Sequence, residues 1–265
     1  MKSNDVRFRA ILRESHFRAP VFENGKNLIS NQIKDFLKKW PAVFNWLKKR
    51  IGPDHSPASG FSLASQIRKQ FGLNLEHKVI VNIGSGTNRI HPEIINIDIL
   101  PFKNVDIVAD IVELPLANES VDGIICDTVL EHITNPDLAM RELSRILKPG
   151  GALITIVPFL YPYHSSPNDF HRWTSEGLRH MLERNEMRVT ELGVLGGPMG
   201  ALQSILMHVF AIILSFGSKT LYFIFTQMFM AILSPLKLLD IVLMRSPYAI
   251  EAASGMYAIS KKNEH

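Results

Sequence analysis

Two glycines separated by one residue follow an apolar run of the kind that forms a buried β-strand. The run spans 79–83, and the chain continues as Gly84-Ser85-Gly86. A strand that ends in Gly-x-Gly lets the backbone pass close to a bound ligand, where a side chain would collide with it. The pattern alone is weak, because ordinary tight turns after strands also contain glycine.

An aspartate ends the next apolar run, 12 residues after Gly86. Asp98 is the only acidic residue of this run, which ends as Asn96-Ile97-Asp98. In a doubly wound sheet this position meets the hydroxyls of a bound ribose. A carboxylate can accept two hydrogen bonds from a cis-diol. The glycines and Asp98 together therefore predict a nucleotide-type site, with a solvated aspartate at a strand end as the alternative.

Further polar residues follow the next two apolar runs. Asp110 could accept a hydrogen bond from an adenine amino group while Ile111 packs on the ring. Asp127 follows the fourth run, and open α/β sheets bind ligands at the carboxyl ends of such strands. Ordinary strand-end turns are the alternative. Glu131 and His132 are interpreted as helix-start residues that are satisfied locally.

A long loop after the fifth apolar run carries several ionisable side chains. Because a histidine titrates near neutral pH, His164 could take a proton from a hydroxyl acceptor while Asp169 orients its ring. In the alternative, Asp169 pairs with Arg172 to brace the loop, and the histidines lie at the surface. No metal is expected, because His164 and His171 lack a supporting ligand spacing and Cys126 is the only cysteine.

Short apolar runs alternate with helical stretches from residue 79 onward, which predicts βαβ units and a parallel sheet. One helix is expected at 136–147, ended by Lys148-Pro149-Gly150-Gly151, and another from a Thr174 cap to about Arg184. The expected strands are 79–83, 94–97, 105–109, 123–126, 152–157, 187–194 and 255–261.

The order and spacing of these fragments resemble the class I S-adenosylmethionine (SAM)-dependent methyltransferases, in particular the type 11 methyltransferase domain. The resemblance covers roughly 76–193 plus the last strand. It implies a Rossmann-like seven-stranded α/β sheet that is mostly parallel with an antiparallel last strand. The motifs that carry it are Asn82–Gly86, Asn96–Asp98, Ala109-Asp110, Leu114-Pro115, Ser120–Asp122, Leu130–His132 and Leu147–Gly151.

The resemblance also implies that SAM is the cofactor and that its binding residues lie at the strand ends. Asn82 stands where the family usually has an acidic residue, and Asn88 where it often has a third glycine. Asn82 can still form hydrogen bonds but adds no charge. By this resemblance, Gly84 and Gly86 line the methionine and ribose parts of SAM, and Asp98 binds the ribose hydroxyls. Asp110 and Ile111 contact the adenine, and Asp127 lies beside the methionine. Asn82 and Ser85 complete the set of cofactor-binding residues.

Two other functions compete with methyl transfer. A nicotinamide-dependent oxidoreductase would use a related sheet, but the turn after the first strand lacks the third glycine of that fingerprint. A non-catalytic scaffold attached to a membrane could keep the fold without the cofactor, and the neutral Asn82 is compatible with it. The binding of SAM or of NAD distinguishes these functions.

The composition is that of a folded protein, with 46% hydrophobic and 20% charged residues over 265. Residues 1–70 hold 14 Lys and Arg against 5 Asp and Glu, whereas the remainder holds 15 against 20. A basic first quarter suits an anionic partner such as a membrane surface, and a solvated extension is the alternative. No nucleic acid is expected, because the basic zone lacks a recognisable reading motif. The N-terminus lacks the apolar core of a secretory signal.

An apolar segment interrupts the chain before the last expected strand. Residues 192–218 and 220–236 carry no charge, and Pro198, Gly217 and Pro235 punctuate them as a helical hairpin. Within this segment the nearly all-apolar runs 201–216 and 221–233 are each shorter than the roughly 20 apolar residues of a single span. The hairpin is therefore expected to enter one leaflet or to pack on a partner subunit of a homo-oligomer. The lack of a polar helix face favours the membrane.

The expected organisation has three parts. A basic N-terminal helical extension occupies 1–75, the SAM-binding methyltransferase domain occupies 76–197 and 252–265, and the apolar helical insert occupies 198–251. The expected activity is methyl transfer to a small-molecule, sugar or lipid-linked acceptor. The expected location is cytoplasmic, peripheral or monotopic on the inner face of the cell membrane.

Overall fold

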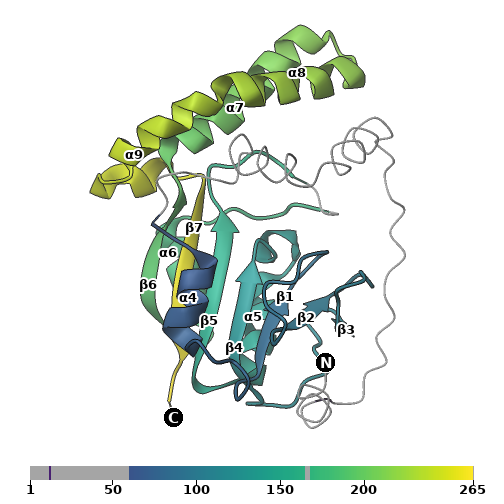
Figure 1. Ribbon diagram of the computed structural model, residues 1–265, viewed down its shortest axis with the longest axis vertical. Helices are drawn as coiled ribbons and strands as arrows, with labels where there is room; N and C mark the ends of the chain where they lie inside the picture. The colour runs from purple at the N-terminus through teal and green to yellow at the C-terminus, as the bar shows by residue number, and fades with distance from the viewer. Residues whose placement is uncertain (1–11, 13–59, 165–167, 265) are drawn as a thin grey trace.

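The computed structural model describes Leu12, residues 60–164 and residues 168–264 of the chain (Figure 1). Most of the predicted N-terminal extension, including its basic amphipathic stretch at 28–51, lies outside the described residues. Leu12 forms an isolated antiparallel bridge with Leu116.

Seven strands form one sheet in the order β3-β2-β1-β4-β5-β7-β6. The first five strands pair in parallel, and β7 pairs antiparallel with both β5 and β6. The predicted Rossmann-like α/β sheet with an antiparallel last strand is confirmed. The strands are β1 (Ile80–Ile83), β2 (Ile95–Asp98), β3 (Ile107–Val108), β4 (Val121–Asp127), β5 (Leu147–Pro158), β6 (Met187–Gly196) and β7 (Gly255–Lys262).

Helices cover both faces of this sheet (Figure 1). On one face α4 (Leu63–Phe71) packs its buried side chains against β1, β4, β5 and β7. On the other face α5 (Pro136–Ile146) and α6 (Ser175–Glu183) enclose the larger core. Thr174 caps α6 by accepting a hydrogen bond from the Gly177 N–H, as the sequence predicts. The branched residues of the central strands are therefore buried on both sides, as in other parallel sheets.

The predicted start of the fifth strand is wrong. The segment Lys148-Pro149-Gly150-Gly151 was expected to separate helix from strand, but β5 begins at Leu147 and contains it. Leu147 pairs with Val121, and the register between the strands shifts before Gly123 pairs with Ala152. Gly150 has a φ of 73°, so the irregularity is accommodated by glycine.

The apolar insert is a pair of helices, α7 (Pro198–Ser215) and α8 (Lys219–Leu233), joined by a turn in which Phe216 and Gly217 have positive φ angles. Short helices η2 (Ser234–Leu239), α9 (Asp240–Leu243) and η3 (Pro247–Ala252) return the chain to β7. Gly196 pairs with Gly255, and Gly255 pairs with Pro158. The insert therefore leaves and rejoins the sheet beside the carboxyl end of β5 (Figure 1).

By length and composition alone, two helical stretches of the described chain could cross a membrane. One is Pro198–Ser215, and the other is the 25-residue stretch Lys219–Leu243. Only 39% and 17% of their respective apolar windows are buried within the protein. The second stretch is longer than the sequence predicts, because η2 and α9 continue the direction of α8 beyond Pro235.

Candidate functional site

The turn after β1 and the end of β2 are in direct contact. The Gly86 N–H donates a hydrogen bond of 2.7 Å to Asp98 Oδ2, and the Ser85 N–H donates one of 3.2 Å to the carbonyl of Ile97. The other carboxylate oxygen, Oδ1, accepts a hydrogen bond from the Leu100 N–H at 2.9 Å. Asp98 is thereby fixed beneath the glycine turn, at the carboxyl edge of the sheet. The two strongest sequence motifs form one structural unit.

A buried pair of amides lies under the same turn. Asn82 Nδ2 donates to Asn96 Oδ1 at 3.2 Å, and both side chains are buried. Asn96 Nδ2 in turn donates to the carbonyls of Asn88 and Asn104, each at 2.9 Å. The amide of Asn82 therefore fastens β1 to β2. A carboxylate at this position could not donate the hydrogen bond to Asn96.

The remaining cofactor candidates lie at the ends of β3 and β4. Asp110 Oδ1 accepts a hydrogen bond from the Val112 N–H at 3.1 Å, which forms a local turn. Ile111 is buried in the main core. Asp127 ends β4 and accepts a hydrogen bond from the hydroxyl of Thr128, whose φ of 53° is unusual for a residue that is not glycine. The structure brings Asp127 to the same sheet edge as the glycine turn.

The turn has properties that suit a polar ligand such as SAM. Ser85 is only 6% exposed, and its hydroxyl has no hydrogen-bond partner among the described residues. A Cβ built on Gly86 would meet no atom within 4 Å. A buried hydroxyl without a partner costs free energy, and a hydrogen bond from a bound molecule would remove that cost. The residues present therefore fit the cofactor that the sequence resemblance implies.

The loop after β5 is fastened to the segment after β4. The Phe170 N–H donates to the carbonyl of Glu131 at 2.7 Å, and the rings of His132 and His171 contact the carbonyls of Asn168 and Thr134. Residues 165–167 of this loop are outside the described residues. The loop and η1 (Leu130–His132) thus form one wall beside the carboxyl ends of β4 and β5.

Asp169 pairs with Arg172 within this loop. Asp169 Oδ2 accepts hydrogen bonds from Arg172 Nη2 at 2.6 Å and from the His164 N–H at 2.8 Å. Burial alone would raise the pKa of Asp169, but these hydrogen bonds outweigh it and lower the pKa to about 2. Asp169 Oδ2 also lies 3.4 Å from His164 Nδ1. The bracing pair and the His–Asp approach, which the sequence left as alternatives, are both present.

The carboxylate of Glu131 faces the ring of His164 on the opposite side. His164 Nε2 lies 3.5 Å from Glu131 Oε1, and His132 Nε2 lies 3.9 Å from the same oxygen. Interaction with Glu131 is the main reason that the pKa of His164 lies above its usual value, against the opposing effect of partial burial. The expectation that Glu131 is satisfied locally is wrong, because its side chain is fully buried and neither oxygen has a hydrogen-bond partner among the described residues. No periodicity in the sequence links Glu131 to His164, so sequence reasoning missed this group.

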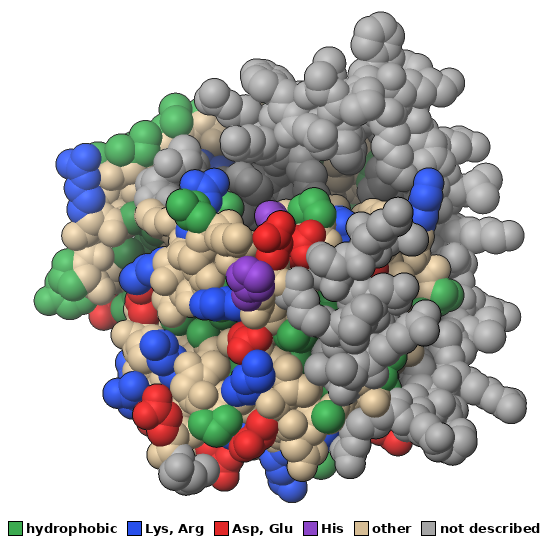
Figure 2. All heavy atoms as spheres, turned by 60° about the horizontal axis from the view of Figure 1, so that its bottom comes forward, with side chains coloured by type: hydrophobic (Ala, Val, Ile, Leu, Met, Phe, Trp, Pro, Cys, Tyr) green, Lys and Arg blue, Asp and Glu red, His purple; other side chains and the backbone are tan. Residues whose placement is uncertain are grey.

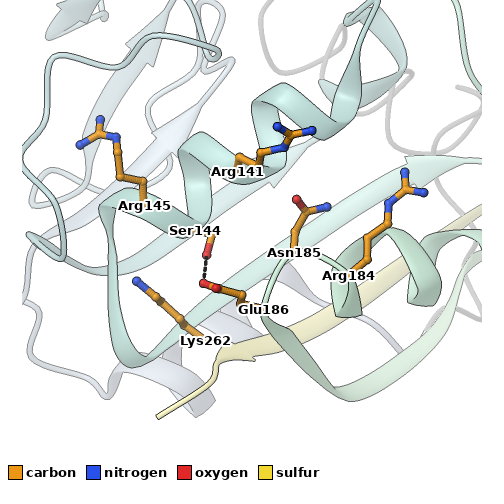
Figure 3. Close-up of a pocket in the computed structure, with 7 residues that line it drawn as sticks. All are labelled: Arg141, Ser144, Arg145, Arg184, Asn185, Glu186 and Lys262. Atoms are coloured by element: carbon orange, nitrogen blue, oxygen red, sulfur yellow. Dashed lines mark hydrogen bonds between the residues drawn. The ribbon is translucent and has the colours of Figure 1, made fainter. Parts of the chain in front are cut away.

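A separate pocket lies at the far edge of the sheet (Figure 3). It is formed by the end of α5, the segment before β6 and the end of β7, near the amino ends of β4 and β5. Three of its basic side chains have acidic partners: Arg145 pairs with Glu142, Arg184 with Asp137 and Lys262 with Glu119. The face of the molecule in Figure 2 likewise carries basic and acidic side chains interspersed. This edge is distinct from the one that carries the glycine turn.

The α/β sheet is open and its seventh strand is antiparallel, a glycine turn follows β1, and an acidic residue ends β2. These features define a Rossmann-like nucleotide-binding fold. Residues 81–155 match the family model described as a methyltransferase domain. This chain therefore contains a segment similar to a methyltransferase domain, in agreement with the resemblance that its motifs show. The matched residues run from β1 into β5 and include the glycine turn, Asp98 and Glu131.

Proteins similar to this chain include two relatives in sequence and, among solved structures, a methyltransferase. An uncharacterised protein of Methanocaldococcus jannaschii is 30% identical over 140 residues, which are 48% of this chain and 60% of that protein. An uncharacterised protein of a Streptomyces fradiae transposon is 42% identical over 55 residues, 21% of this chain and 16% of that protein. The 1,6-didemethyltoxoflavin-N1-methyltransferase of Burkholderia thailandensis is 10% identical, with 94% of each chain covered and a TM-score of 0.47. This chain thus spans less than two thirds of the length of either relative.

Proposed function

We propose that this protein transfers a methyl group from SAM to a small-molecule, sugar or lipid-linked acceptor. The observation that carries the proposal is the hydrogen bond between the Gly86 N–H and Asp98 Oδ2, at 2.7 Å, which joins the glycine turn to the strand-end carboxylate. SAM supplies a methyl group that is already activated as a sulfonium. The protein then has mainly to align the acceptor with that methyl group, so few catalytic side chains are needed.

Each part of the cofactor has candidate partners in this chain. The second lone pairs of the Asp98 oxygens remain free to accept hydrogen bonds from ribose hydroxyls, because each oxygen has a single described donor. Gly84, Ser85 and Gly86 would adjoin the methionine and ribose parts, with Asp127 beside the methionine. Asp110 and Ile111 would adjoin adenine. In this proposal Asn82 holds the turn in place from below through Asn96.

The acceptor side of the proposed site is the wall formed by η1 and the loop after β5. His164 is the candidate catalytic residue of this wall, since its side chain is one-third exposed at 33%. Asp169 is a positioning residue in this proposal, because its oxygens are committed to Arg172 and to the His164 N–H. The carboxylate of Asp169 thus contacts both the ring of His164, at 3.4 Å, and the guanidinium of Arg172, at 2.6 Å.

Cofactor binding tests the core of the proposal. Equilibrium dialysis with labelled SAM should show saturable binding by the wild-type protein, and Asp98→Ala should weaken it by about 10-fold or more, since hydrogen bonds to a charged group contribute about 1.5–3 kcal/mol. Glu183→Ala, at an exposed position on α6, is the matched control and should bind like the wild type. Unchanged binding by Asp98→Ala, or stabilisation by NAD and not by SAM, would refute the assignment.

We further propose that the protein works at a membrane surface through its apolar insert. Large apolar side chains are exposed along α7, α8 and the returning segment. A surface helix of a protein in water has a polar face instead. The insert joins the site wall directly, because the Phe159 and Leu160 N–H groups donate to the carbonyls of Ser254 and Ala253. The large hydrophobic residues of the insert that are more than half exposed are Ile212, Ile213, Phe216, Ile232, Leu238, Leu239, Val242 and Tyr248.

Vesicle binding tests the role of the insert. Full-length protein should co-sediment with vesicles of phosphatidylethanolamine and phosphatidylglycerol, and Ile212→Glu with Phe216→Glu should abolish most of that binding. Leu73→Glu changes an equally exposed apolar residue at 84% exposure, near the opposite edge of the sheet, and should have no effect. If the wild type is instead a stable dimer that the double variant dissociates, and no vesicle binding occurs, the insert is a subunit interface and the membrane proposal is wrong.

A further inference from the structure

Three potential metal ligands converge beside the proposed acceptor site. The carboxylate of Glu131 and one ring nitrogen from each of His132 and His164 all lie within 4.8 Å of one another. Glu131 and His132 come from η1, and His164 comes from the loop after β5. Two imidazoles and one carboxylate form a donor set that suits first-row transition metals.

The carboxylate of Glu131 is the unusual member of this group. It is fully buried, and neither of its oxygens has a hydrogen-bond partner among the described residues. Arg172 interacts electrostatically with Glu131, but it donates its hydrogen bonds to Asp169 and to the carbonyls of Tyr161, Pro162 and His171. A buried carboxylate without hydrogen bonds is costly unless a positive charge compensates it. The rings of His132 and His164 either compensate the charge of Glu131 themselves or help to bind a cation that compensates it.

Both histidine rings are oriented as metal-ligating rings usually are. His132 directs Nδ1 to the carbonyl of Asn168, and His164 directs Nδ1 to the carbonyl of Pro162 at 3.3 Å. A ring that donates its Nδ1–H to a carbonyl keeps the lone pair of Nε2, and metal-ligating histidines are commonly held in this way. In both rings it is Nε2 that approaches Glu131 Oε1, at 3.9 Å and 3.5 Å.

We propose that Glu131, His132 and His164 bind a divalent first-row transition metal cation such as Zn²⁺ or Mn²⁺. Ligand atoms that share zinc at bond lengths of about 2.0–2.1 Å lie about 3.4 Å apart, so side-chain rotations bring this group to ligating distance. Three protein ligands leave coordination positions for water or for an acceptor oxygen. His164 is one-third exposed, which gives the cation a path from solvent.

A metal ion at this site would restrict the methyl acceptor to a narrower chemical class. This part of the inference rests on the proposed function. A cation at the acceptor wall holds an oxygen-bearing acceptor, such as a hydroxyl with a neighbouring oxygen, and lowers the pKa of a hydroxyl bound to it. His164 would then serve as a ligand, and Asp169 would fix its ring from the Nδ1 side at 3.4 Å. Binding of the cation itself does not depend on methyl transfer.

Titration of tag-free, chelator-treated full-length protein with Zn²⁺, Mn²⁺ and Co²⁺ tests the site without any turnover. We expect saturable binding of one cation, with Co²⁺ giving the visible absorption bands of a protein-bound ion. His132→Ala and the near-isosteric Glu131→Gln should each weaken binding by at least about 10-fold. His180→Ala, which changes an exposed histidine on α6 outside the group, should bind like the wild type.

The outcomes separate this proposal from the methyltransferase proposal. SAM binding is measured in parallel in the presence of EDTA, where both His132→Ala and the wild type should bind SAM alike, which also shows that the variant is folded. Retained SAM binding with no saturable cation binding would overturn the metal site alone. Cation binding that His132→Ala and Glu131→Gln leave unchanged would overturn it as well, since the ion would then be held elsewhere.

Discussion

At the scale of single residues, Gly84 and Gly86 have similar backbone angles but different surroundings. Their φ angles are 65° and 55°. A Cβ on Gly84 would lie 2.4 Å from Val129 Cγ2, whereas a Cβ on Gly86 would meet no atom within 4 Å. The first glycine is therefore required by the protein's own packing, and the second leaves open space at the proposed cofactor site.

This difference predicts that alanine at the two positions has separable effects. Gly84→Ala should destabilise the fold by about 1–3 kcal/mol, as overpacking does. Gly86→Ala should cost only about 1 kcal/mol for its left-handed backbone but weaken SAM binding strongly. Thermal unfolding and titration with S-adenosylhomocysteine measure the two effects. The double variant Gly84→Ala/Val129→Ala should recover part of the lost stability, and the absence of any recovery would show that Val129 is not the cause.

Tyr257 gives a prediction for alkaline pH. Burial and the hydrogen bond that its hydroxyl donates to Glu191 at 2.9 Å raise the pKa of Tyr257 to about 12. Because the folded-state pKa is higher than the unfolded value of about 10, the contribution to stability is full below pH 10 and is lost as the pH rises towards 12. Tyr257→Phe should cost about 1 kcal/mol at neutral pH.

The pH dependence of that cost is the decisive measurement. Urea unfolding of the wild type and of Tyr257→Phe should show a difference that shrinks between about pH 10 and 12. Tyr248→Phe, at an exposed tyrosine in η3, is the control and should show no such change. If the difference in unfolding free energy between the wild type and Tyr257→Phe stays constant up to pH 12, the protonated hydroxyl of Tyr257 does not stabilise the fold by donating to Glu191.

The sequence was sufficient to predict that Asp98 meets the glycine turn, but not that Glu131 meets His164. Asp98 and the glycine turn lie at strand ends, so their meeting follows from the parallel sheet itself. Glu131 and His164 meet through an irregular loop whose path depends on Arg172, Asp169 and contacts to η1. Such a path has no periodicity to read, which is why Glu131 was mistaken for a locally satisfied residue.

At the scale of elements, the strands with β-branched runs were predicted well, and the largest boundary error lies at the start of β5. β1 and β6 begin within one residue of their predicted starts. β5 begins five residues early, because pairing of Leu147 with Val121 extends the strand through a Pro-Gly-Gly segment. Turn residues indicate a break in a chain, but a neighbouring strand can bridge that break by a register shift.

A buried carboxylate joins the start of the insert to its returning segment. Asp240, the first residue of α9, accepts hydrogen bonds from the Met199 N–H at 2.9 Å and the Gly200 N–H at 3.1 Å. These N–H groups lie in the first turn of α7 and have no partner within that helix. Gly197 leaves space for the carboxylate, since a Cβ there would lie 2.3 Å from Asp240 Cγ. The start of α7 and the returning segment are thus held together at one point.

Asp240→Ala should therefore loosen the insert and spare the sheet. The loss of two hydrogen bonds to a buried carboxylate should cost about 1–3 kcal/mol, confined to the insert. Hydrogen exchange should become faster in α9 and η2 and in the first turn of α7, with β4 and β5 unchanged. Glu251→Ala, at an exposed position in η3, is the control. Equal acceleration throughout the sheet would show that the insert and the domain unfold as one unit.

At the scale of the whole molecule, the proposed cofactor site and the apolar insert share one edge of the sheet. β6 and β7 pair with each other along their length, and the insert connects them at the end beside Pro158. An acceptor held near a membrane surface would reach the wall formed by η1 and the loop after β5 without crossing the domain. The opposite edge, with its interspersed charges, would face the water (Figure 2).

The basic first quarter of the chain adds an electrostatic contribution that salt can separate from the apolar one. Residues 1–70 hold 14 Lys and Arg against 5 Asp and Glu, and each basic residue near an anionic bilayer contributes about 1 kcal/mol. Raising NaCl from about 0.1 M to about 1 M shortens the Debye length from about 10 Å to about 3 Å and screens that attraction. Binding to phosphatidylglycerol vesicles should fall several-fold over this range, and binding to phosphatidylcholine vesicles should change little.

Lys38→Glu with Lys39→Glu should reduce the salt-sensitive part of vesicle binding, whereas Phe216→Glu should reduce the salt-resistant part. Vesicle binding that Lys38→Glu/Lys39→Glu leaves unchanged at low salt would show that these lysines do not attract the membrane.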